Sequence, residues 1–169
     1  MGGHRQKSGF TLTKVNVSNR KSGGFQEAFT LIELLVVIAI IGLLSTLAVV
    51  ALGNARQKAR DSKRLSDLKQ TQTALELYYT DKSEYPSESG TLGAGNLVCL
   101  DNVAPGFHAS GCTASAYMNL VPKDPLAAQS YVYTMTTGTY TITATLEGSV
   151  GDLAGNIQLT PSGITVVTP

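Results

Sequence analysis

Residues 29–45 read FTLIELLVVIAIIGLLS, a nearly continuous apolar run with one carboxylate, Glu33, close to its start. No charged residue occurs from Leu34 to Gly53, which is about the length that an α-helix needs to cross the hydrocarbon core of a bilayer. A carboxylate beside such a run is costly in lipid, so Glu33 should have a partner. We therefore predict a transmembrane helix over residues 29–53 in which Glu33 has a functional role.

The segment before this run differs from it in composition. Residues 1–28 are polar, contain Gly and Ser, and carry five basic residues against one acidic residue. They are too hydrophilic for the apolar core of an ordinary secretory signal. Residues 29–169 carry eight basic against eleven acidic residues. We predict that residues 1–28 are a leader that is cut off. The remaining acidic protein, whose basic residues are not interleaved with aromatic ones, is not predicted to bind nucleic acid.

A helical pattern continues beyond the apolar run. Apolar and amide side chains recur at three- and four-residue steps at Leu65, Leu68, Gln72, Leu75 and Tyr79. The opposite face carries the charged residues Arg56, Lys63, Asp67, Lys69 and Glu76. This pattern predicts an amphipathic helix and turn over residues 54–86, ended by Tyr85-Pro86 because proline cannot continue a helix. A single helix from Phe29 to about Thr80 would be ~78 Å long.

The C-terminal third has the pattern of β-strands. Residues 131–135 and 139–146 alternate in polarity around Thr137-Gly138, which is typical of a hairpin. Residues 156–160 and 164–167 predict a second hairpin, whereas residues 87–115 have no such alternation and are predicted to be loops. A sheet this small needs a partner on its other face. We predict an α+β fold, in which the long N-terminal helix packs on a small antiparallel sheet within residues 87–169.

Two cysteines, Cys99 and Cys112, bracket a loop rich in Gly, Ala and Ser. Outside the cytoplasm such a pair usually oxidises, and a loop this short would stabilise the fold by about 3 kcal/mol on the chain-entropy model. Two free thiols are the alternative. The histidines are His4 and His108, and no CxxC pair is present, so a zinc site is not predicted.

Ala28, Phe29 and Glu33, followed by the apolar run, resemble the class III leader junction and N-terminal helix of type IV pilins and type II secretion pseudopilins. In this family the residue before the cut is usually Gly, the next is Phe, and Glu stands four residues later. The resemblance implies a pilin-like fold, prepilin peptidase cleavage between Ala28 and Phe29, and methylation of the new amino group of Phe29. A cut between Gly24 and Phe25 would supply the usual Gly but would leave Glu33 eight residues in, out of the family register.

The resemblance also implies a role for Glu33 in filament assembly. In the family this carboxylate neutralises the amino terminus of the neighbouring subunit, and two buried opposite charges cost less together than apart. The alternative is a carboxylate favoured by the helix dipole. The implied partners are prepilin peptidase, identical or related pilin subunits, an inner-membrane assembly platform and membrane lipid. The protein would be single-pass in the cytoplasmic membrane before assembly, and part of a periplasmic or cell-surface filament afterwards.

Two branches of the family remain open, a type IV pilus subunit and a secretion pseudopilin. Tyr85-Pro86 and the turn of residues 122–125, Pro-Lys-Asp-Pro, favour the pseudopilin, whereas the two cysteines favour the pilus subunit. A rival from another class is a single-span membrane-anchored binding protein that does not polymerise. An enzyme is not predicted, because the chain has no recognisable nucleophile motif and no Gly-rich phosphate loop.

Major pseudopilins commonly hold Ca²⁺ near the C-terminal sheet, so the resemblance makes calcium a possible ligand. The local oxygen donors are Glu147, Asp152 and Asn156, with Asp101 further away. Calcium usually takes six to eight oxygens, and two carboxylates with one amide supply few of them. Turn formation by these residues is the alternative, and no other cofactor is predicted.

A basic cluster follows the apolar run directly and consists of Arg56, Lys58, Arg60, Lys63 and Arg64. Counted by the positive-inside rule, these charges would place the C-terminal domain in the cytoplasm. The family resemblance implies the reverse orientation. We therefore expect the cluster to lie at lipid headgroups or against acidic neighbours.

Overall fold

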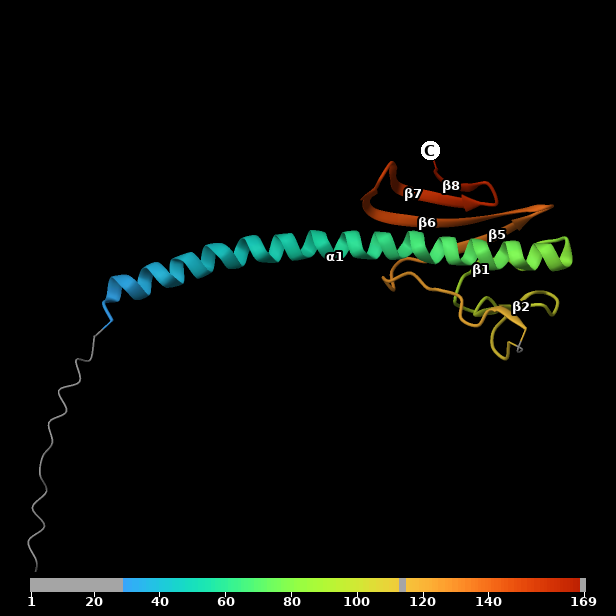
Figure 1. Ribbon diagram of the computed structural model, residues 1–169, viewed down its shortest axis with the longest axis horizontal. Coiled ribbons are helices and arrows are strands. Elements are labelled where there is room, and N and C mark those ends of the chain that lie inside the picture. Colours follow the sequence, from blue (N-terminus) through green and yellow to red (C-terminus); the bar gives the residue numbers. More distant parts are fainter. Residues whose placement is uncertain (1–28, 113–114, 168–169) are drawn as a thin grey trace, which may run out of the picture. The chain divides into compact units, whose positions relative to one another are not determined.

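The computed structural model describes residues 29–112 and 115–167, so the predicted leader, including Ala28, lies outside the described residues. Within these residues the chain forms one long helix and eight strands (Figure 1). It divides into two compact units between Ile41 and Gly42. Helix α1 runs from Leu31 to Lys82 and contributes to both units.

The first unit is described from Phe29 to Ile41 and consists of the start of α1. Its apolar side chains are exposed, among them Leu31 and Ile32 at 80% and 69%. By length and composition α1 could cross a membrane, and none of its most apolar 18-residue window is buried. The predicted membrane helix thus corresponds to a helix whose apolar side chains lack a covering element in the described chain.

The second unit contains two antiparallel sheets. The larger has five strands in the order β1-β5-β6-β7-β8, with bounds β1 Gly90–Thr91, β5 Val132–Thr136, β6 Thr139–Val150, β7 Leu153–Thr160 and β8 Gly163–Val166. The smaller has the order β3-β2-β4, with bounds β2 Cys99–Asp101, β3 Phe107–His108 and β4 Ala116–Met118. Strands β5–β6 and β7–β8 are the two predicted hairpins, which are confirmed.

The core lies between α1 and the five-stranded sheet, whose strand β6 follows the helix in Figure 1. Leu68, Leu75 and Tyr78 of α1 are buried together with alternate residues of β5, β6 and β7. Tyr133 and Tyr140 from this sheet are fully buried, and their rings stack with centroids 5.9 Å apart. The predicted α+β class, a long helix packed on a small antiparallel sheet, is confirmed.

The prediction that residues 87–115 are loops is wrong in part, because they contain β1, β2 and β3. These strands are two or three residues long, too short to show a period-two pattern. Pairing across the segment defines them, with Cys99 opposite His108 and Leu100 opposite Phe107.

The three-stranded sheet also packs on α1. At Gly106, where φ is +102°, an added Cβ would lie 2.9 Å from the Tyr78 ring, so only glycine allows this approach. The rings of Tyr78 and Tyr117 meet edge to face with centroids 5.9 Å apart. The C-terminal half of α1 is therefore covered by two sheets.

This second contact explains a correction to the predicted helical stripe. Leu68 and Leu75 are buried as expected, but Tyr79 is 42% exposed and its neighbour Tyr78 is buried instead. Asp67, predicted on the solvent face, is 5% exposed for a different reason: beside the larger sheet, it accepts a hydrogen bond from the buried Tyr131 hydroxyl at 3.1 Å and lies 2.9 Å from Lys63 Nζ. A helix covered by two sheets buries a wider face than a single apolar stripe.

Candidate functional site

The first unit places Glu33 in a reciprocal cap at the start of α1. The backbone amide of Thr30 donates to Glu33 Oε2 at 2.8 Å, and the Thr30 hydroxyl donates to the same oxygen at 2.7 Å. In return, Glu33 N donates to Thr30 Oγ1 at 3.3 Å. This is a capping box, which satisfies backbone amides that have no partner within the helix. Within a single chain, Glu33 therefore acts as a helix-capping carboxylate, which is the alternative given above. Its role in filament assembly stays a prediction.

An open apolar hollow of about 410 Å³ lies beside the Glu33 carboxylate. It is lined by Phe29, Ile32, Glu33, Val36 and Val37. Phe29, the predicted first residue of the mature protein, is 89% exposed. The hollow is apolar apart from the Glu33 carboxylate at its edge. Cleavage after Ala28 and methylation of Phe29 stay predictions, since Ala28 lies outside the described residues.

The second unit contains a group of charged side chains that we call the Arg64 cluster, consisting of Arg60, Asp61, Arg64, Asp124 and Glu147. Arg64 is fully buried and donates from Nε and Nη2 to the two oxygens of Asp124 at 2.8 and 2.9 Å. Its Nη1 donates to Asp61 at 2.6 Å and to Glu147 at 2.7 Å. The cluster thereby joins α1 to β6 and to the turn of residues 122–125.

Asp61 of α1 accepts hydrogen bonds from backbone amides of β6. The register of β6 against β7 shifts between Thr145 and Ser149, which marks a bulge. At this bulge the amides of Glu147 and Gly148 donate to the two oxygens of Asp61 at 3.0 and 2.9 Å. Asp61 is 1% exposed, so these bonds satisfy a buried charge.

The two arginines strongly favour the charged form of Glu147. Hydrogen bonds from Arg60, and then from Arg64, lower the pKa of Glu147 from 4.5 to about 2. In turn, the bonds to Asp124 raise the pKa of Arg64 above its already high value. Two members of the basic cluster are thus neutralised by acidic residues of the same chain, one of the two locations expected for them.

Acid should therefore weaken the second unit in a defined range of pH. A depressed pKa means that the unfolded chain binds the Glu147 proton more readily, so the resulting stability is present above about pH 4.5 and is lost as the pH falls toward 2. We expect the melting temperature of the full chain in detergent to fall over this range. Glu147→Gln should lower the neutral-pH plateau and flatten the slope, whereas Glu84→Gln, at an exposed carboxylate, should leave both unchanged. Equal slopes in wild type and Glu147→Gln would contradict this assignment.

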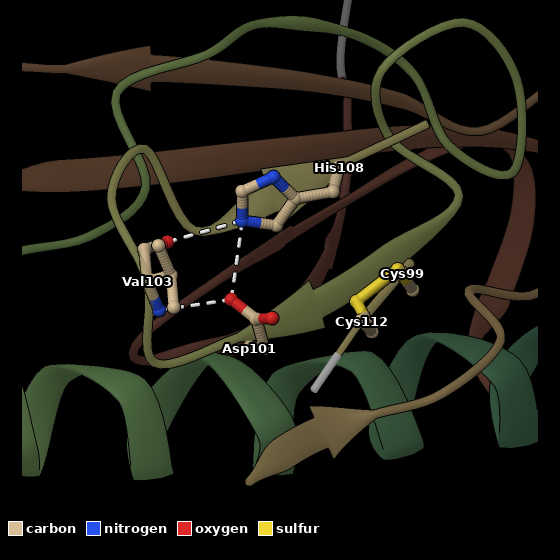
Figure 2. The surroundings of a disulfide bond; sticks show 5 residues. All are labelled: Cys99, Asp101, Val103, His108 and Cys112. Carbon is tan, nitrogen blue, oxygen red and sulfur yellow. Dashed lines mark hydrogen bonds and ion pairs between the residues drawn. A yellow bond between two sulfur atoms is a disulfide. The ribbon is translucent and has the colours of Figure 1, made fainter. Parts of the chain in front are cut away.

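The structure contains the Cys99–Cys112 disulfide, which joins strand β2 to the segment that follows β3 (Figure 2). Beside it, the buried carboxylate of Asp101 accepts a hydrogen bond from Val103 N at 2.8 Å. The His108 ring nitrogen Nε2 is 3.1 Å from both Asp101 Oδ1 and the Val103 carbonyl. A disulfide and a local polar network together hold the turn between β2 and β3.

The predicted calcium donors do not form one site. Glu147 is held by two arginines, Asp101 by Val103 and His108, and Asn156 Oδ1 accepts a bond from Thr145 at 2.9 Å. Across residues 29–112 and 115–167, no group of three or more His, Cys, Asp or Glu side chains is placed to hold a metal ion. The donor set does not fit calcium, because the central carboxylate is already paired with two positive charges.

Sequence reasoning placed Asp61 within the basic cluster without pairing it with Arg64, and it did not find Asp124 as a partner. Asp124 is 60 residues from Arg64 in sequence, and periodicity carries no information on such a contact. A usable signal was present at Asp61, the one acidic residue within the basic cluster and three residues before Arg64. That spacing places both side chains on one helix face.

Comparison with known proteins yields two family matches on adjoining parts of the chain. Residues 20–49 match the prokaryotic N-terminal methylation motif, and residues 51–156 match the family of type II secretion system (T2SS) protein G. No solved structure matches the chain.

Individual relatives agree with these families. The chain is 37% identical over 105 residues to type II secretion system core protein G of Pectobacterium carotovorum subsp. carotovorum, covering 62% of this chain and 65% of that protein. It is 38% identical over 100 residues to the Klebsiella pneumoniae protein of the same name, covering 59% and 69%. It is 35% identical over 100 residues to the Escherichia coli (strain K12) protein of that name, covering 59% of this chain and 66% of that protein. The chain thus spans slightly less than two thirds of the first relative.

Proposed function

Because the chain belongs to the type II secretion system protein G family, we propose that it is a structural subunit of a type II secretion pseudopilus. The resemblance to pilins and pseudopilins predicted from residues 29–45 is confirmed at the level of the family. The proposed role is assembly rather than catalysis. The proposed partners are prepilin peptidase, further pilin-like subunits, the inner-membrane platform and lipid.

One observation supports this proposal above the others. The first half of α1 is strongly apolar and is exposed throughout, and its most apolar window has no buried residue. Exposure of so large an apolar surface to water is unfavourable. Lipid would therefore cover it before assembly, and other helices would cover it afterwards. A helix that only anchored a binding protein would need lipid alone, and would not require the methylation motif matched at residues 20–49.

The proposed assembly step pairs charges within an apolar surface. Removal of residues 1–28 would leave an ammonium group at Phe29, and Glu33 of a neighbouring subunit would neutralise it. The hollow beside Glu33 is open and apolar, which favours helix packing around the pair. Two opposite charges that leave water together cost less than either charge alone.

The proposed orientation places the second unit outside the cytoplasm. Residues 56–64 oppose this by the positive-inside rule, but three of their five basic side chains are paired within the chain: Arg60 with Glu147, Arg64 with Asp61, Asp124 and Glu147, and Lys63 with Asp67. The folded unit therefore presents less positive charge near the membrane than its sequence contains.

Processing tests the proposal directly. We expect the mature protein to begin at Phe29 and to carry one additional methyl group on its amino terminus. Intact-mass measurement of protein from sheared filaments would show both features, and cells lacking prepilin peptidase provide the control, in which the full precursor should remain. A protein that keeps its leader or never sediments as a filament would favour the membrane-anchored binding protein instead, and a start at Phe25 would contradict the predicted cut after Ala28.

A further inference from the structure

Three carboxylates from separate parts of the second unit converge on one guanidinium. Asp61 comes from α1, Asp124 from the turn before β5, and Glu147 from the bulge of β6. All three contact Arg64 at 2.6–2.9 Å, and Arg64 itself has no exposed surface. Three adjacent carboxylates, two of them buried, could not all stay ionised without a cation.

We propose that Arg64 is the resident cation of this unit, so that its fold requires no divalent metal ion. The guanidinium connects helix, turn and strand, the three elements that a metal ion would otherwise have to join. The inference concerns what holds the unit together, and it does not depend on the proposed role in secretion.

The oxygen atoms of the cluster support this assignment, because none is left for a metal. Asp61 accepts two backbone amides as well as Arg64. Asp124 accepts Arg64 through both oxygens and the Leu126 amide through one of them. Both oxygens of Glu147 accept from Arg60. Calcium needs six to eight oxygens, and each carboxylate oxygen here already has an N–H donor.

The charge balance indicates what loss of Arg64 would do. The intact cluster sets two guanidinium groups against three carboxylates, and two backbone amides give further compensation at Asp61. Without Arg64, three carboxylates would face Arg60 alone. That excess of two negative charges is the charge that one divalent cation carries.

The test uses the full chain, purified in a non-ionic detergent, with Ca²⁺ as the added ligand. We expect the melting temperature of the wild type to be the same in EGTA and in millimolar Ca²⁺. Arg64→Met should melt roughly 10 °C lower in EGTA, since it strands buried charges, and should recover part of this loss in Ca²⁺. Lys63→Met is the matched control, because it removes a half-exposed cation from the same helix and leaves the cluster intact. It should show no response to Ca²⁺.

A second variant separates charge from packing. Arg64→Lys keeps the positive charge but lacks the planar fork, so it should lose less stability than Arg64→Met and should not respond to Ca²⁺. This arm remains informative if Arg64→Met does not fold. A rise in the melting temperature of the wild type with Ca²⁺, or Ca²⁺ bound to the wild type in equilibrium dialysis, would overturn the proposal. So would a folded Arg64→Met that ignores Ca²⁺.

Discussion

Glu33→Ala is expected to abolish filament assembly while leaving membrane insertion and leader cleavage intact. The apolar run and the Ala28-Phe29 junction are unchanged in this variant, so the precursor should enter the membrane and be cut. The ammonium group at Phe29 of the next subunit would then lose its proposed partner. An unpaired buried charge costs roughly 3–5 kcal/mol, and a polymer repeats that cost at every subunit. The measurement is the yield of sheared filaments from cells without the native copy.

Two further variants distinguish pairing from helix capping. Glu33→Gln keeps the shape of the side chain but not its charge, and should fail or nearly fail to assemble. Thr30→Val removes the hydroxyl that donates to Glu33 but keeps the carboxylate, and should still form filaments. Wild-type filament yield from Glu33→Ala would refute the charge-pairing role and would favour a membrane-anchored protein that does not polymerise.

The double variant Cys99→Ser/Cys112→Ser is expected to lower the free energy of unfolding by about 3 kcal/mol, because the unfolded chain gains freedom when this short loop is open. The segment closed by the disulfide contains Phe107, which is 1% exposed and meets the Tyr133 ring edge to face at 5.2 Å. Loosening it should therefore expose part of the core. Equilibrium denaturation of the full chain in detergent would measure the loss.

Reduction of the wild type provides the control for this variant. Treatment with a thiol reductant should produce the same loss of stability as the two substitutions, and should have no effect on the double variant. Alkylation without reductant should leave both cysteines of freshly isolated protein unmodified. Ready labelling of both would show that they are free thiols in the cell, which is the alternative left open by the sequence.

The sequence predicts those parts of the fold that depend on local patterns. The apolar run and the hairpin around Thr137-Gly138 each extend over enough residues for a period to be visible, and both are present in the structure. The wrong assignment of Tyr79 differs by one position from the buried Tyr78. The apolar stripe of a helix indicates the centre of its buried face. The width of that face depends on how many elements cover the helix.

The charged interior could not be predicted in the same way. Glu147 and Asp61 are 86 residues apart, and the amide of Glu147 that contacts Asp61 lies where the register of β6 against β7 shifts. By residue type alone, Glu147 is a candidate calcium donor, because carboxylates suit that ion. Its arginine partners follow only from the tertiary structure. The type of a residue indicates which ligands it can bind. Its position in the folded chain decides which of them it contacts.

The reciprocal bonds between Thr30 and Glu33 give subunit joining the character of an exchange. In the proposed membrane-bound subunit, the Glu33 carboxylate accepts two hydrogen bonds from Thr30 of its own chain. It is therefore not an unpartnered charge. In the proposed assembly step, the carboxylate would exchange these donors for the ammonium group of a neighbouring Phe29, and the electrostatic gain would be only the difference between the two pairings. In the proposed filament, each such contact would therefore contribute less free energy than the pairing of two bare charges would.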